Sequence, residues 1–289
     1  MYLIKSVPGD PYLMIKPSSN LDDAKPEFLT GKYSVRLDEE FPEEFLEKFM
    51  QKFKEIKSLN LSTCYYYKAK SSYVYQMPNL EALSISVWKD TDFILDCNTL
   101  PATIKTLWLT VYSKKKIINL ESLNSHIEDL MISDFDEKDL TKLSNLTNLK
   151  SLSFATAKIK SLKGIENLTN LENLSLGGVR SLTDISGITA LQKLERLEFD
   201  ICWKLKDFTP VGELKSLKEL QLLDCKNLES IKFVKELSNL KRLSTLGTTI
   251  INDYDTTPAE HVPVFFGSQN NKYNKQYPEK EIHKKLDDL

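Results

Sequence analysis

One short pattern of apolar and polar positions, apolar-x-x-apolar-x-apolar, recurs along most of the chain. The first clear copy covers residues 56–61, and later copies start at residues 80, 104, 127, 149, 171, 194, 217 and 240. Alternation with a period of two inside each copy predicts a short β-strand. Because successive copies start only 22 to 24 residues apart, the pattern predicts about nine equivalent strands.

The remainder of each unit follows a second pattern, in which apolar residues recur every three positions. One example comprises Leu182, Ile185, Ile188 and Leu191. This spacing predicts one or two turns of 3₁₀ helix or a short α-helix returning to the next strand. No unit of this size can bury its apolar side alone, so the units are expected to stack as a solenoid around a shared core.

The sequence motifs of the units resemble those of a known family. Leu168-Thr-Asn-Leu171 and Leu182-Thr-Asp-Ile185-Ser-Gly-Ile188 are similar to leucine-rich repeats, specifically to the 22–23-residue repeats of bacterial internalins and protein-phosphatase regulators. The resemblance covers residues 56–246. It implies an α/β fold, a horseshoe-shaped solenoid of about nine units with a parallel β-sheet on the concave face, and protein binding through that face.

The ninth position of each unit departs from the family pattern. Internalin repeats usually place there an asparagine that forms a buried ladder. In this chain the position holds Cys64, Trp88, Tyr112, Phe135, Ala157, Val179, Cys202 and Cys225. Irregular bends are therefore expected in the first half, and small buried thiols inside the later bends. Cys202 and Cys225 fall on adjacent units, where we expect stacked free thiols, although their separation also permits a disulfide.

Both ends of a solenoid need covering. Residues 1–55 are expected to form a strand-rich segment followed by an amphipathic capping helix over 38–53. In that helix Phe41, Phe45, Phe49 and Phe53 recur every four residues, and the acids at 38–40 would begin it. Residues 247–289 lose the pattern and contain three prolines. They are expected to form a C-terminal cap and tail, with a short helix at the end.

Composition excludes several classes of function. With 39 Lys and Arg against 41 Asp and Glu, no net field attracts nucleic acid or an anionic membrane. The apolar runs are too short to span a bilayer, and the N-terminal residues lack the apolar stretch of a signal peptide. These features predict a cytoplasmic protein. The four cysteines and three histidines are dispersed, with no spacing typical of a metal site.

No motif for catalysis is visible. The chain lacks a phosphate-binding glycine loop, G-x-S-x-G and H-E-x-x-H. His261 and His283 both fall in the C-terminal segment, where a surface or capping role is expected. The sequence therefore predicts a protein that is not an enzyme and needs no cofactor.

Candidate binding residues are found at the outward positions of the strands, the third, fifth and seventh of each unit. Small hydroxyl side chains dominate the first six units, whereas acids gather in the seventh and eighth. An exposed tryptophan among small neighbours is typical of a protein-binding hot spot. The candidates are Trp108, Asp129, Met131, Arg196, Glu198, Asp200, Glu219 and Gln221, together with Asp224 on the bend that follows.

A tyrosine-rich loop, TCYYYKAKSSYVYQ at residues 63–76, adds two further candidates, Tyr65 and Tyr66. Aromatic residues beside lysines can stack on nucleic acid, but the adjoining strand positions carry no basic track. We therefore interpret this segment as part of a degenerate first repeat. Tyr67 and Tyr73 are expected to replace missing leucines in the core, and the other tyrosines to be exposed beside the N-terminal cap.

These features lead to one main hypothesis. The chain is predicted to be a non-catalytic protein-binding scaffold, in its finer form a bacterial intracellular immunity-type inhibitor of a toxin. Its partner would carry a basic patch. The alternative is a secreted or surface-displayed internalin-like adhesion module, and an enzyme built on the repeat scaffold is a remote third.

Overall fold

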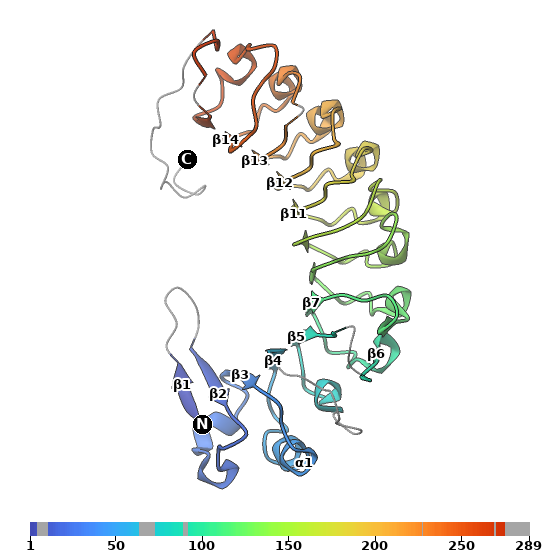
Figure 1. Ribbon diagram of the computed structural model, residues 1–289, viewed down its shortest axis with the longest axis vertical. Helices are drawn as coiled ribbons and strands as arrows, with labels where there is room; N and C mark the ends of the chain where they lie inside the picture. The colour runs from blue at the N-terminus through green and yellow to red at the C-terminus, as the bar shows by residue number, and fades with distance from the viewer. Residues whose placement is uncertain (5–10, 64–72, 89–91, 227, 269, 275–289) are drawn as a thin grey trace. The chain divides into compact units, whose positions relative to one another are not determined.

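The computed structural model describes residues 1–4, 11–63, 73–88, 92–226, 228–268 and 270–274, with the side chains of residues 2, 63 and 73 outside this description. The chain forms two compact units, residues 1–133 (unit 1) and 134–289 (unit 2). In each unit the strands line one side of the stack and short helices line the other (Figure 1). The leucine-rich repeat solenoid predicted from the sequence is thereby confirmed.

Unit 1 is built on a sheet whose strands are parallel except for the first, β1, which pairs antiparallel with β2. A separate pair of two-residue strands, β6 and β8, lies on the return side. The strands are β1 (Tyr2–Ile4), β2 (Tyr12–Ile15), β3 (Ser34–Asp38), β4 (Ser58–Thr63), β5 (Ala82–Ser86), β6 (Leu95–Asp96), β7 (Thr106–Val111), β8 (Ile117–Ile118) and β9 (Asp129–Ile132).

Unit 2 is built on parallel strands, and the pairing from β10 to β15 keeps a continuous register. They are β10 (Ser151–Phe154), β11 (Asn173–Gly177), β12 (Arg196–Asp200), β13 (Glu219–Leu223), β14 (Arg242–Leu246) and β15 (Val264–Gly267). The ninth copy of the hexad is a complete strand, although the sequence loses its apolar pattern there. In β14 the inward positions include Thr245, which is wholly buried.

The return segments are 3₁₀ helices, as the three-residue apolar spacing predicts. The one α-helix of the described residues is α1 (Glu43–Lys52). The 3₁₀ helices are Leu21–Asp23, Pro26–Leu29, Tyr73–Gln76, Cys97–Thr99, Leu120–Ser122, Thr141–Leu143, Ile165–Asn167, Ser186–Ala190, Thr209–Glu213, Lys232–Glu236 and Thr257–Ala259.

The core of each unit is a stack of identical layers. In the layer of β12, Leu197 is 1% exposed and Phe199 is fully buried, and the return segment adds Leu205 and Val211, both fully buried. The same positions are buried in the neighbouring layers of unit 2. Each buried leucine contributes roughly 1.5–3 kcal/mol relative to an exposed one, which explains why the hexad recurs so regularly.

The N-terminal segment differs in detail from the prediction of a helix over 38–53. The helix begins at Glu43, because residues 34–38 form β3 and pair with β4. The acids in its first turn are Glu43 and Glu44, and Asp38 belongs to a strand. The phenylalanine stripe packs as expected, with the Phe49 and Phe53 rings stacked at 4.9 Å and both side chains fully buried.

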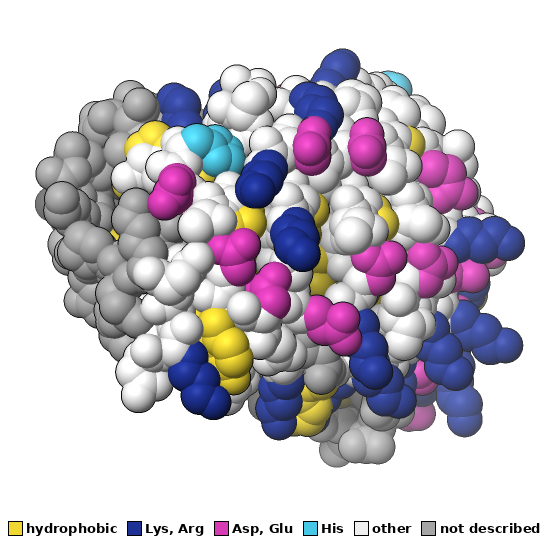
Figure 2. Space-filling model, turned by 90° about the horizontal axis from the view of Figure 1, so that it is seen from above, with side chains coloured by type: hydrophobic (Ala, Val, Ile, Leu, Met, Phe, Trp, Pro, Cys, Tyr) yellow, Lys and Arg dark blue, Asp and Glu magenta, His cyan; other side chains and the backbone are white. Residues whose placement is uncertain are grey.

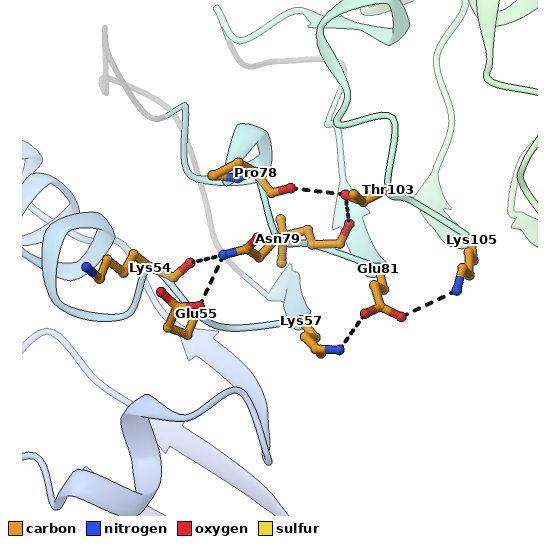
Figure 3. A network of polar contacts seen from close by, with 9 residues as sticks. Lys54, Glu55, Lys57, Pro78, Asn79, Glu81, Thr103 and Lys105 are labelled. Carbon is orange, nitrogen blue, oxygen red and sulfur yellow. Dashed lines mark hydrogen bonds and ion pairs between the residues drawn. The ribbon is translucent and has the colours of Figure 1, made fainter.

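Side chains at the edges tie each repeat to the one before it. An asparagine that precedes the hexad donates its amide to a carbonyl of the previous repeat: Asn79 to Lys54, Asn124 to Ala102, Asn170 to Thr147 and Asn239 to Lys215, at 2.7–3.0 Å. In Figure 3 a run of exposed ion pairs joins Lys57, Glu81 and Lys105, which lie on three successive repeats. These ion pairs and the asparagine hydrogen bonds between repeats both favour the observed register.

The ninth positions are buried in unit 2 as expected, with Cys202 and Cys225 fully buried free thiols. Each thiol donates to a carbonyl of the preceding repeat at 3.5 Å. Hydrogen bonding with Cys225 and burial both raise the pKa of the Cys202 thiol. In unit 1 the pattern fails at Trp88, which is 38% exposed. Pairing between β5 and β7 also slips between Ile85 and Ser86, so the expected irregular bends are present there.

The tyrosine-rich loop lies largely outside the described residues. This applies to Cys64, Tyr65, Tyr66 and Tyr67, and to the side chain of Tyr73. Tyr75, which was expected to be exposed, is only 4% exposed and contacts Phe93 edge-on at 5.6 Å. Its burial shows that Tyr75 belongs to the core of the first repeat.

The sheet of unit 2 continues beyond the last hexad. Residues 264–267 form β15, and Phe265 pairs with Leu243 of β14. The side chain of His261 lies 3.1 Å from the carbonyl oxygen of Leu237, which is a contact of the kind expected for a capping role. The helix predicted at the extreme C-terminus falls outside the described residues.

Candidate functional site

The face of each sheet opposite the leucine core, here called the open face, carries the third and fifth positions of every hexad. In unit 1 the strand register aligns one row of outward side chains across β3, β4, β5, β7 and β9. The row reads Arg36, Asn60, Ser84, Trp108 and Met131. A parallel row reads Ser58, Ala82, Thr106 and Asp129. Small side chains are thus followed by one large aromatic side chain.

The residues of these two rows other than Asp129 and Met131 line a groove of about 310 Å³ in unit 1. Serine and alanine line its floor, at positions where other strands carry larger residues. Tyr12 on β2 and Trp108 on β7 belong to its lining. The lining residues are Tyr12, Ser34, Val35, Arg36, Ser58, Leu59, Asn60, Ala82, Leu83, Ser84, Thr106 and Trp108.

Trp108 combines exposure with a fixed orientation. Its side chain is 43% exposed, the most of the three tryptophans. The indole Nε1 donates a hydrogen bond of 3.2 Å to Oδ2 of Asp129 on the next strand. Because the hydrogen bond restrains the ring, less side-chain entropy is lost when a partner packs against it. Met131 is the direct cross-strand neighbour of Trp108. The predicted candidates Trp108, Asp129 and Met131 therefore lie together.

Arg36 is the one charged side chain of the groove lining. Its nearest carboxylate is that of Asp38, at 4.0 Å, and its own side chain is 32% exposed. The Nε of Arg36 is buried and has no hydrogen-bond partner among the described residues. The guanidinium is thus weakly paired within the protein, and its terminal nitrogens remain donors for an anionic group.

The open face of unit 2 carries more charge. The register aligns Asn173, Arg196, Glu219 and Arg242 in one row and Ser175, Glu198, Gln221 and Ser244 in the next. Arg196 Nε lies 3.8 Å from Oε2 of Glu219, and Gln221 donates to Glu219 Oε1 at 3.0 Å. Glu219 is therefore largely compensated. Figure 2, which views the molecule from above relative to Figure 1, shows acidic and basic side chains interleaved on the surface seen from that direction.

The remaining acids of that face differ from one another. Burial, and then the nearby carboxylate of Asp224, raise the pKa of Asp200. Asp224 itself accepts a hydrogen bond of 2.8 Å from the backbone N–H of Thr248. A side chain at Gly247 would collide with this carboxylate, and its φ of +67° also favours glycine. Asp224 therefore has a structural role in the bend, whereas Glu198 and Asp200 present their charge to the face.

The predicted site residues thus fall into two separate groups. Trp108, Asp129 and Met131 belong to unit 1, and Arg196, Glu198, Asp200, Glu219, Gln221 and Asp224 belong to unit 2. Tyr65 and Tyr66 lie outside the described residues. Whether a partner contacts any of these side chains stays a prediction.

Sequence reasoning missed Tyr12 and Arg36 because it placed the first repeat at residue 56. The spacing between paired strand residues could have revealed both. Val35 pairs with Leu59, 24 residues later, and Leu13 pairs with Val35, 22 residues later. Extending the repeat register backwards by two units would have placed Arg36 in the same row as Trp108.

A second missed feature lies in the bends of unit 2. The Trp203 ring is contacted by the Arg180 guanidinium carbon at 4.6 Å and by Lys226 Nζ at 4.5 Å from its centroid. These residues occupy equivalent positions in three successive repeats. Trp203, 37% exposed, thus belongs to the bends, and its surroundings differ from those of Trp108.

The described part of the chain contains no cluster of three or more His, Cys, Asp and Glu side chains arranged to hold a metal ion. No helix within the same residues has both the length and the apolar composition required to cross a bilayer.

Comparisons with known proteins agree with the repeat architecture. Residues 116–266 match a family model described as a leucine-rich repeat region. The structure of an internalin, InlF, from Listeria monocytogenes is similar with a TM-score of 0.54 and 18% identity, over 82% of this chain and 75% of that chain. This likeness shows the same fold.

Two other internalins of that organism are also similar. For internalin C2 the TM-score is 0.46 and the identity 26%, over 58% of this chain and 73% of that chain. For the functional domain of InlJ, which includes a cysteine ladder, the values are 0.47 and 18%, over 66% of this chain and 39% of that chain. No curated protein matches the sequence significantly.

Proposed function

The chain belongs to the leucine-rich repeat proteins, and from that premise we propose that the open faces of its two units bind a protein partner without catalysis. The observation that carries the proposal is the groove of unit 1, where small side chains lie beside the exposed, oriented indole of Trp108. Small side chains let a partner backbone approach closely, and tryptophan is over-represented among binding hot spots.

The proposed mechanism is complementarity to rigid surfaces. The strands that carry the side chains are held by the hydrogen bonds of the sheet, so little backbone order has to be gained on binding. In unit 1, Trp108 and Met131 act as apolar anchors. In unit 2, Glu198 and Asp200 favour a basic patch of the partner, whereas Glu219 contributes less because Arg196 and Gln221 already engage it.

The finer proposal is an immunity-type inhibitor that acts in the bacterial cytoplasm and masks the active site of a toxin. Two features support it: the acids Glu198 and Asp200 on the open face of unit 2, and the bacterial origin of the similar internalin structure. The alternative is an adhesion module that is secreted or displayed on the cell surface, by analogy with internalins.

The test is co-expression with the product of the adjacent gene. We expect a stable complex that survives purification. Co-expression should also restore the growth that is lost when the adjacent gene product is expressed alone. Absence of both a complex and growth rescue would contradict the immunity role. Recovery of the protein from the culture medium or cell wall of its native host would instead favour the adhesion role.

A further inference from the structure

The groove of unit 1 differs in charge from the open face of unit 2. Its lining includes one cation, Arg36, and no carboxylate. Within the described residues Arg36 forms an ion pair with Asp38 alone, at a long distance of 4.0 Å, and its Nε has no hydrogen-bond partner there. A guanidinium that is so weakly engaged favours a carboxylate, which it can bind with two parallel hydrogen bonds.

The register fixes the distance between this cation and the aromatic anchor. Arg36, Asn60, Ser84 and Trp108 stand in one row on four adjacent strands. Three inter-strand steps of about 4.8 Å separate Arg36 from Trp108 by roughly 14 Å. An extended peptide that crosses the strands advances about 3.3 Å per residue, so four residues span this separation.

The intervening positions suit an extended backbone. Ala82 and Ser84 leave room for the main chain, and Ser84 is only 8% exposed. The side-chain oxygen of Asn60 already accepts from Ser62, both from its backbone N–H at 3.0 Å and from its hydroxyl at 2.6 Å. The amide hydrogens of Asn60 therefore remain as donors to a peptide carbonyl.

From these observations we propose that the unit 1 groove binds an extended segment of the partner protein in which an acidic side chain precedes or follows a large apolar side chain by four residues. The carboxylate binds Arg36, and the apolar side chain packs on the indole of Trp108. The proposal rests on the proposed function and deepens it, because it assigns to unit 1 a specificity opposite in charge to that of unit 2.

The experiment is selection of randomised nine-residue peptides, displayed on phage, against the immobilised full chain. We expect recovered sequences to be enriched in Asp or Glu separated by four residues from Trp, Phe, Tyr or Leu. One recovered peptide is then synthesised, and its dissociation constant is measured by fluorescence anisotropy. Arg36→Gln should weaken it roughly tenfold or more, as expected for loss of a charge-assisted pair.

Matched variants separate the groove from the rest of the surface. Arg180→Gln removes an arginine from a bend of unit 2, and Trp203→Ala removes an indole of similar exposure, so neither should change the affinity of the peptide. Trp108→Ala should weaken it at least as much as Arg36→Gln. Circular dichroism of each variant checks that the fold is retained.

Several results would overturn the proposal. They are enrichment of basic or purely apolar peptides, no enrichment at all, or equal affinity of wild type and Arg36→Gln for an enriched peptide. Self-association that Arg36→Gln abolishes would identify a second copy of the chain as the occupant and also overturn it. None of these results affects the wider function if the native partner still binds and depends on unit 2, for example through Asp200.

Discussion

The indole Nε1 of Trp108 donates a 3.2 Å hydrogen bond to Oδ2 of Asp129, and this bond joins an exposed aromatic ring to the neighbouring strand. The residue directly opposite Trp108 in the register is Met131, so Asp129 lies diagonally across the ladder. Diagonal neighbours in a sheet are within reach of aromatic side chains. The orientation of the principal predicted anchor therefore depends on a carboxylate that itself need not touch the partner.

Removal of that carboxylate should weaken partner binding without removing the anchor. We expect Asp129→Ala to reduce affinity by about 0.5–1.5 kcal/mol, the usual net worth of such a hydrogen bond. Asp129→Asn keeps an acceptor and should stay closer to wild type. Titration calorimetry measures the affinity, and the ¹⁵N-indole resonance of Trp108 should shift strongly only in the alanine variant. Equal affinity of wild type and Asp129→Ala would show that orientation of the indole is unimportant.

A buried threonine of unit 2 should prove important for stability. Thr249 is fully buried, and its Oγ1 accepts from the backbone N–H of Cys225 at 2.8 Å and donates to the carbonyl of Leu222 at 2.9 Å. Thr249→Val keeps the shape but removes the hydroxyl that bonds both groups, which should cost about 1–3 kcal/mol. Urea unfolding gives this free energy. Thr248→Val changes an exposed neighbour and should stay within about 0.5 kcal/mol of wild type; equal losses would contradict this account of the bend.

Much of the fold follows from the sequence because the hexad is a burial pattern. Leu197 and Phe199 point inwards in β12 for the same reason that Leu220 and Leu222 do in β13, and the predicted strands coincide with the observed ones. The pattern is uninformative where another group replaces the apolar residue. Thr245 is buried in β14, and β15 follows an interval without hexads, so hydrophobicity alone did not reveal that the sheet continues.

Aspartates before the 3₁₀ helices should make unit 2 sensitive to acid. Hydrogen bonds from the hydroxyl and the backbone N–H of Thr209 lower the pKa of Asp207 below its ordinary value of 3.8. Ionised Asp207 thus stabilises the fold above about pH 3.8, and this contribution is lost as the pH falls through the lowered folded-state pKa.

Substitution of Asp207 tests this directly. Asp207→Ala should cost about 0.5–1.5 kcal/mol at pH 7, and its difference from wild type should shrink as the pH falls below 3.8. Urea unfolding at a series of pH values provides the comparison. Glu213→Ala removes an exposed charge from the same return segment and serves as the control, which should show no such trend. A constant difference at all pH values would refute the linkage.

Asp200 should show the opposite sign. Burial and the nearby carboxylate of Asp224 raise its pKa above 3.8, so the folded state binds the proton more tightly than the unfolded state does. Ionised Asp200 therefore destabilises the fold, and this penalty is absent below pH 3.8 and complete once the pH exceeds the raised pKa.

Asp200→Asn should accordingly be more stable than wild type at pH 7 and similar to it near pH 3. Thermal unfolding at the two pH values measures the difference. A variant that is less stable than wild type at pH 7 would show that the Asp200 carboxylate has a favourable partner in the fold. If the stabilised variant also binds the partner more weakly, the Asp200 carboxylate destabilises the fold but contributes to binding.

The site was less predictable than the fold. Outward positions on the strands follow from alternation, so Trp108, Met131 and Glu198 could be assigned to the open face from the sequence alone. Glu219 pairs with the Arg196 side chain 23 residues away, and Asp224 accepts from the backbone N–H of Thr248 24 residues away. Neither partner can be read from the local sequence. Arg36 was missed because its strand precedes the first clear hexad, although its spacing to Asn60 matches the repeat.

The most direct test of the central claim, that the open faces bind a protein, compares wild type with the double variant Trp108→Ala, Asp200→Lys. Binding of the adjacent gene product is measured by titration calorimetry, and folding is monitored by thermal unfolding of the same samples. We expect binding to be abolished while the melting temperature stays nearly unchanged, because Trp108 is exposed and the Asp200 carboxylate contributes no favourable stability at neutral pH. Undiminished binding, or parallel loss of binding and stability, would contradict the account.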